Sequence, residues 1–195
     1  MKQLRSPGCV RIAVATLLVA SFASEQSVVA LDAAHLQVPF HRQETNGCGP
    51  ASVAMVQGYW SAHISGLAQP AESELRARLP VTENQGTLLS DMRRYLDSKG
   101  YYVFTIQADP IDLTRQISKG RVPIVALKNK GTADLHYVVV TGLDQRKVWM
   151  NDPAKRGPVS ADRRKFEERW SRAANWMLLA VPRGVESESH PVPLQ

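Results

Sequence analysis

The sequence has few cysteines: two in 195 residues, Cys9 and Cys48. Cys9 lies in an N-terminal segment that we expect to be removed, so the mature chain keeps Cys48 alone and can form no internal disulfide. A lone thiol is unusual in an exported protein, because oxidising compartments favour disulfide pairing. A single cysteine is most often a small buried apolar residue, but the residues around Cys48 indicate a chemical role.

Two other features are missing. No pair of histidines and no Cys-x-x-Cys motif has metal-ligand spacing, so we expect neither a metal nor another cofactor. The longest apolar run, residues 12–23, is well short of the roughly 20 residues that span a bilayer. We therefore expect no stable membrane insertion.

The apolar run instead forms the middle of an export signal. Basic residues precede it (Lys2, Arg5 and Arg11), and small residues follow it. We expect residues 1–23 to be cleaved after Ala23, with cleavage after Ala30 as the alternative, which places the protein in the periplasm or outside the cell. Residues 31–183 then form one domain, and the polar tail 184–195 is expected to be disordered.

Charge gives little reason to expect a nucleic-acid partner. The formal net charge is +6, and loss of the three basic signal residues reduces it to +3. A basic cluster remains, and we interpret it as a solvated helix face: Lys155, Arg156, Arg163, Arg164 and Lys165.

The order of the expected elements predicts an α+β fold. Helices are expected at 49–60, at 71–79, from Thr87 as the cap to a stop at Gly100, and from Asp109-Pro110 to Gly120. Strands are expected at 101–107, 122–127, 136–143, 147–151 and 175–181, with one more helix at 161–170 behind a Ser160 cap. Helices followed by an antiparallel sheet favour the α+β class.

Cys48 lies in the segment Gly47-Cys-Gly-Pro-Ala-Ser, at the start of the first expected helix. Pro50 suits a first helical turn, so the thiol is placed at the positive end of the helix dipole. There the thiolate is favoured, and a basic partner lowers the cysteine pKa further. The glycines on both sides would let a substrate backbone approach the sulfur. We therefore predict that Cys48 is a nucleophile.

His136 is the predicted general base. It opens the strand His-Tyr-Val-Val-Val-Thr-Gly, whereas the other four histidines lie in polar or loop segments. The acid that orients His136 is predicted to be Asp152, at the end of the next strand; Asp134 and Asn151 are the alternatives. Gln43, five residues before Cys48, is a candidate oxyanion donor beside the Cys48 backbone N–H.

Together, Gln43, Gly47-Cys48-Gly49-Pro50-Ala51, His136-Tyr-Val-Val-Val and Asn151-Asp152-Pro153 resemble the bacteriocin-processing cysteine peptidases, a papain-like family that removes double-glycine leaders, and especially its stand-alone members. The resemblance covers residues 38 to about 181. It implies a papain-like fold with N-terminal helices on a C-terminal antiparallel sheet. It also implies Cys48 as nucleophile, His136 as base, Asp152 as orienting acid and Gln43 as oxyanion donor.

The expected function is therefore that of an exported thiol hydrolase, a cysteine peptidase that acts on a peptide or protein through a thioester. Two alternatives remain open. One is a non-catalytic peptide-binding module of the same fold. The other is an acyl transferase or transpeptidase, because Cys-Gly-Pro-Ala-Ser is also similar to phytochelatin synthases. A cell-wall hydrolase of the NlpC type is disfavoured, since its Asp-Cys-Ser-Gly core is absent.

Overall fold

The structure is a computed structural model that describes residues 35–82 and 86–185. The predicted signal segment and its two cleavage points lie outside the described residues, as does the predicted disordered tail apart from Gly184 and Val185. In the described part of the chain, no helix combines the length and the apolar character needed to cross a membrane.

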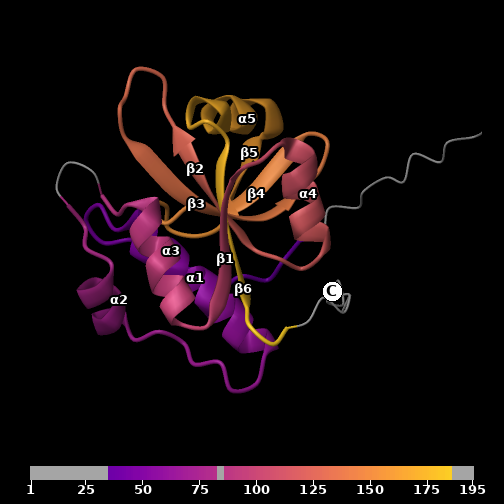
Figure 1. The fold of residues 1–195 in the computed structure, drawn as a ribbon. Helices are drawn as coiled ribbons and strands as arrows, with labels where there is room; N and C mark the ends of the chain where they lie inside the picture. Colours follow the sequence, from indigo (N-terminus) through magenta and orange to yellow (C-terminus); the bar gives the residue numbers. More distant parts are fainter. Residues whose placement is uncertain (1–34, 83–85, 186–195) are drawn as a thin grey trace, which may run out of the picture. The chain divides into compact units, whose positions relative to one another are not determined.

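Five helices and six strands are described (Figure 1). In chain order they are α1 (Cys48–His63), α2 (Glu72–Arg78), α3 (Leu89–Ser98), β1 (Tyr101–Gln107), α4 (Pro110–Ser118), β2 (Pro123–Lys128), β3 (Leu135–Leu143), β4 (Lys147–Asn151), β5 (Val159–Asp162), α5 (Arg163–Arg172) and β6 (Trp176–Pro182).

All six strands join one sheet in the order β1-β6-β2-β3-β4-β5, and every neighbouring pair is antiparallel. The helix α1 packs against β2 and β3, and α3 packs against β1 and β6. The helix α4 contacts β2 and β3, and α5 contacts β2, β4 and β5. In Figure 1, α2 and α3 lie on one side of β1 and α4 lies on the other. This mixed arrangement of helices and antiparallel sheet confirms the predicted α+β class.

The central strands and α1 form the core because their side chains are apolar on nearly every position. Strands β2 and β3 are buried over most of their length, and each contains a run of β-branched residues, 124–125 in β2 and 138–141 in β3, as expected for strands covered by helices. On α1, buried residues run from Cys48 to Trp60 without an exposed stripe. A helix that is apolar all round belongs inside the protein, and this burial fixes the position of Cys48 against the sheet.

Two of the predicted caps are wrong. Thr87 does not cap α3, which begins two residues later with Leu88 at the N-cap position. The Thr87 hydroxyl instead donates to the Pro80 carbonyl, and its side chain packs beside α1. Leu88 itself is half exposed.

The second wrong cap is Ser160. Residues 159–162 form β5, in which Ser160 pairs with Trp149 of β4. The helix α5 therefore starts at Arg163, and its cap is Asp162, whose side chain accepts a hydrogen bond from the Lys165 N–H. The start of α4 is as predicted: Asp109-Pro110 opens the helix, and Asp109 and Asp112 form a capping box around Pro110.

Candidate active site

Cys48 is the first residue of α1, as the sequence predicts, and its side chain is buried. Gly47 at the N-cap position has no side chain to cap the helix, and the first turn carries no acidic residue. The first N–H groups of a helix lack partners within it, and they form the positive end of its dipole. The thiol therefore lies where a negative charge is stabilised.

The glycine after Cys48 has a different role from the expected one. A Cβ at Gly49 would lie 2.6 Å from the Cβ of Thr87, which no real pair of carbons tolerates. Thr87, rather than a substrate backbone, occupies that space. We conclude that Gly49 lets the chain before α3 pack closely against the start of α1.

His136 and Asp152 lie side by side at neighbouring strand ends. His136 is the second residue of β3, and Asp152 follows the last residue of the adjacent strand β4. His136 Nε2 is 2.6 Å from Asp152 Oδ1. The same carboxylate oxygen accepts the Ala154 N–H at 3.0 Å. Because Nε2 is bonded to Asp152, the imidazole nitrogen left for the Cys48 thiol is Nδ1.

The thiol and the imidazole shift each other's pKa in opposite directions. Burial alone would raise the Cys48 pKa, but hydrogen bonds from the His136 side chain and the Tyr137 backbone and the charge of His136 outweigh it, so the Cys48 pKa is lowered. Burial alone would lower the His136 pKa, but hydrogen bonds and charges of Asp152 and Cys48 raise it to about 9. Both shifts favour a thiolate beside an imidazolium near neutral pH.

Asp152 completes this charge arrangement. Burial would raise its pKa, but the hydrogen bond and charge of His136 and the Ala154 N–H lower it. Asp152 therefore stays ionised under the imidazole. A carboxylate in this position fixes the ring orientation and stabilises the imidazolium form.

The two alternatives to Asp152 lie elsewhere. Asp134 is exposed in the loop before β3, and the carboxylate that contacts His136 within the described residues belongs to Asp152. Asn151 is buried, and its Nδ2 donates to the Val38 carbonyl at 3.0 Å. This bond ties the segment before α1 to the end of β4.

Gln43 lies in that same segment and is held next to the Asp152 turn. Its backbone N–H donates to the Pro153 carbonyl at 2.9 Å. Its side-chain oxygen Oε1 is buried and accepts no hydrogen bond from the described residues. The backbone thus brings Gln43 beside the turn that carries Asp152, and four residues of chain separate it from Cys48.

A cavity of about 380 Å³ adjoins this segment. Gln43, Gly47 and Pro50 border it on the side of α1, and apolar residues Leu75, Leu79 and Val81 of α2 and the following loop form the opposite wall. At its rim, Arg76 of α2 forms ion pairs with Glu44 and Glu72. The cavity therefore combines an apolar interior with a charged rim, next to the start of α1.

Sequence reasoning did not find the backbone groups of Ala154 and Tyr137 that contact the site, or the α2 wall of the cavity. The Ala154 N–H bond follows from an aspartate turn that binds the backbone two residues on, so the Asp-Pro pair could have indicated it. The Tyr137 backbone and the α2 wall depend on how distant segments pack, and no local pattern encodes that.

The groups that gather here are a thiol, an imidazole and a carboxylate, the set used for nucleophilic catalysis by a base-activated cysteine. In residues 35–82 and 86–185, no three His, Cys, Asp or Glu side chains are placed so as to hold a metal ion. The arrangement can form a covalent bond to an acyl carbon, and transfer the proton through His136.

Comparison with known proteins agrees with the family resemblance noted in the sequence. Residues 35–176 match the Peptidase_C39 like family. The transport/processing ATP-binding protein ComA of Streptococcus pneumoniae is 32% identical over 130 residues; the match covers 64% of this chain and 16% of ComA. The chain thus spans about a sixth of the length of that curated relative.

Two solved structures share the fold. One is a double glycine motif protease from an AMS/PCAT transporter, in complex with the leader peptide: TM-score 0.58, 22% identity, covering 76% of this chain and 94% of the other. The second is a C39-like peptidase from Bacillus anthracis: TM-score 0.59, 20% identity, 78% and 98% coverage. Both support the predicted papain-like arrangement of helices and sheet.

Proposed function

The chain belongs to the Peptidase_C39 like family, and from this premise we propose that it is an exported cysteine peptidase that cleaves peptide bonds through a thioester acyl-enzyme. The observation that carries the proposal is the chain of contacts from Asp152 through His136 to the buried thiol at the start of α1. A structural cysteine needs no such partners.

In the first step, the Cys48 thiolate attacks the carbonyl carbon of the scissile peptide bond. The carbonyl oxygen takes up the negative charge and faces the Cys48 backbone N–H and the Gln43 side-chain amide. His136, protonated and held by Asp152, then gives its Nδ1 proton to the leaving amine as the C–N bond breaks. The products of this half-reaction are a free amine and a thioester on Cys48.

In the second step, neutral His136 removes a proton from a water molecule, and the resulting hydroxide attacks the thioester carbonyl. The C–S bond breaks, a carboxylic acid leaves, and Cys48 and His136 return to the thiolate and imidazolium forms. The same donors stabilise the second oxyanion. If an amine replaces water in this step, the product is a transferred acyl group.

The substrate is proposed to be a peptide or protein. The family supports peptidase chemistry, and the related double-glycine protease was solved with a peptide bound. In this chain the cavity beside Gln43 would accept residues next to the scissile bond, because one of its walls is apolar and it adjoins the nucleophile's neighbours Gly47 and Pro50.

A peptide-library digest followed by mass spectrometry tests this function. We expect fragments with new carboxyl ends from the wild-type protein and none from Cys48→Ala. Acyl transfer would instead give products heavier than any starting peptide. Absence of both products, with the wild-type protein folded, would leave a peptide-binding module as the better account.

Export is the remaining part of the proposal, and it is supported by the basic, apolar and small residues at positions 2–23. Because signal peptidases cleave behind small residues, the mature protein is expected to begin at Ser24, or at Leu31 under the alternative. N-terminal sequencing of protein recovered from the periplasm or medium would show this. Intact protein that starts at Met1 and stays in the cytosol would refute export.

A further inference from the structure

Strand β1 is an unprotected edge of the sheet. It pairs with β6 on one side, and among residues 35–82 and 86–185 no strand pairs with its other side. The seven residues Tyr-Tyr-Val-Phe-Thr-Ile-Gln contain no charge and no proline. Natural proteins usually blunt such edges with charges, proline or short strands. The opposite edge, β5, is blunted in this way: it has four residues and ends at Asp162.

The exposed backbone groups of β1 can be assigned from its pairing. Arg183 N–H donates to the Gly100 carbonyl and Ala108 N–H donates to the Asn175 carbonyl, in register with the β1–β6 ladder. Antiparallel ladders alternate between residues that bond to the partner and residues that face away. The even-numbered residues of β1 therefore bond to β6, and the odd-numbered ones, Val103 and Thr105 at the centre, point N–H and C=O toward the free edge.

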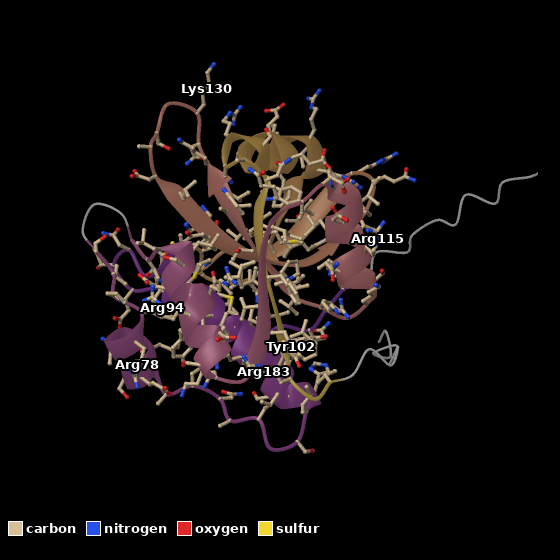
Figure 2. All side chains as sticks on the ribbon, viewed as in Figure 1. Arg78, Arg94, Tyr102, Arg115, Lys130 and Arg183 are labelled. Carbon is tan, nitrogen blue, oxygen red and sulfur yellow. The ribbon has the colours of Figure 1, made fainter. Side chains whose placement is uncertain are left out.

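One face of β1 is also apolar and uncovered. Tyr102, Phe104 and Ile106 are 55%, 52% and 37% exposed. The β6 residues opposite them (Val181, Leu179 and Met177) are buried. On this face of the sheet, β6 is therefore covered by other parts of the protein and β1 is not. Figure 2 shows Tyr102 at the start of β1 beside Arg183, whose guanidinium lies 5.6 Å from its ring.

We propose that a second copy of this chain pairs with this edge, β1 against β1 and antiparallel, so that two sheets become one across a two-fold axis. An antiparallel pairing centred on Phe104 sets Val103 opposite Thr105 of the other copy, and Tyr101 opposite Gln107. In this register each outward-facing N–H of β1 lies opposite a C=O of the second copy, and each outward-facing C=O lies opposite an N–H. The edge is complementary to itself.

The side chains agree with this register. Phe104 faces Phe104 of the second copy, and Tyr102 faces Ile106, in the close, non-hydrogen-bonded pairs in which cross-strand aromatic contacts stabilise a sheet. Because the strand is uncharged, no like charges meet. The charged side chains Lys99, Arg183 and Asp112 near the two ends of β1 are ion-paired within the chain, with Glu74, Asp97 and Arg115. A second copy therefore fits the backbone and the apolar side chains of this edge.

Sedimentation velocity of the purified protein over a wide concentration range tests the dimer. We expect a dimer whose dissociation constant rises at least about tenfold in Phe104→Lys, because two introduced ammonium groups would face each other across the axis. Ile111→Lys also introduces a lysine at an exposed apolar residue, but on α4 and not on β1. This variant should leave the dimer intact. A monomer at every soluble concentration, or an unaffected Phe104→Lys dimer, would overturn the proposal.

A cross-link tests the register directly, in a Cys48→Ser background that removes the native thiol. Phe104→Cys is expected to form an intermolecular disulfide, because directly opposite Cα atoms of a close pair lie about 4.5 Å apart. In Tyr102→Cys the two introduced thiols are about four residues apart along the ladder, roughly 13 Å, and should not cross-link. Cross-linking of Tyr102→Cys alone, or of neither variant, would contradict this pairing.

Discussion

Replacing Asp152 by asparagine is expected to lower peptide turnover by as much as about 10⁴-fold, the loss seen when the orienting carboxylate of a catalytic histidine becomes an amide. Asp152 Oδ1 accepts the His136 Nε2–H at 2.6 Å. An amide of the same shape can offer its own N–H instead, which stabilises the wrong imidazole tautomer. The substitution also removes the negative charge that stabilises the imidazolium.

Asp134→Asn is the matched control, because Asp134 is exposed before β3. Its turnover should stay near that of the wild type. Steady-state kinetics on a peptide found in the library digest would measure both variants, with thermal melting to show that each is folded. Equal losses in the two variants, or a larger loss in Asp134→Asn, would remove Asp152 from its proposed role.

Replacing Gln43 by alanine is expected to lower kcat by about 10² to 10³-fold, roughly 2.7 to 4 kcal/mol, the usual loss for one oxyanion donor. The alkylation of Cys48 by iodoacetamide should change little, because displacement of iodide forms no oxyanion. The two reactions therefore separate a donor from a structural residue. Gln43 is also bonded through its backbone to Pro153, and alanine keeps that bond.

Gln37→Ala serves as the control, because Gln37 is an exposed glutamine of the same segment. It should leave both reactions unchanged. If Gln43→Ala slows alkylation as much as turnover, Gln43 supports the structure around the thiol. If it slows neither reaction, Gln43 has no part in the chemistry.

The sequence predicted the structure correctly where a local pattern of residues is typical of one structural element. Glycine and proline around Cys48 predict a helix start, and α1 begins there. The strand pattern at 136–143 and 147–151 predicts two adjacent strands, and β3 and β4 pair with His136 and Asp152 at neighbouring ends. Local propensity and connectivity were sufficient for these, because the contacts form between neighbours in chain order.

It was less informative where distant segments decide the structure. Thr87 looks like a helix cap, but it packs against Gly49 nearly 40 residues away. Ser160 also looks like a cap, but pairing with β4 draws residues 159–162 into the sheet and leaves Asp162 to cap α5. Tertiary contacts overrode local preference in both cases. The cavity wall from α2 depends on the same kind of contact.

The central claim is that Cys48 and His136 form a reactive thiolate and imidazolium pair. The most direct test is the pH dependence of Cys48 alkylation by iodoacetamide, in the wild type and in His136→Ala. We predict a wild-type midpoint below the ordinary cysteine pKa of about 8.5, because His136 lowers the Cys48 pKa, and a midpoint moved upward in His136→Ala. Midpoints near the ordinary value in both proteins would contradict the account.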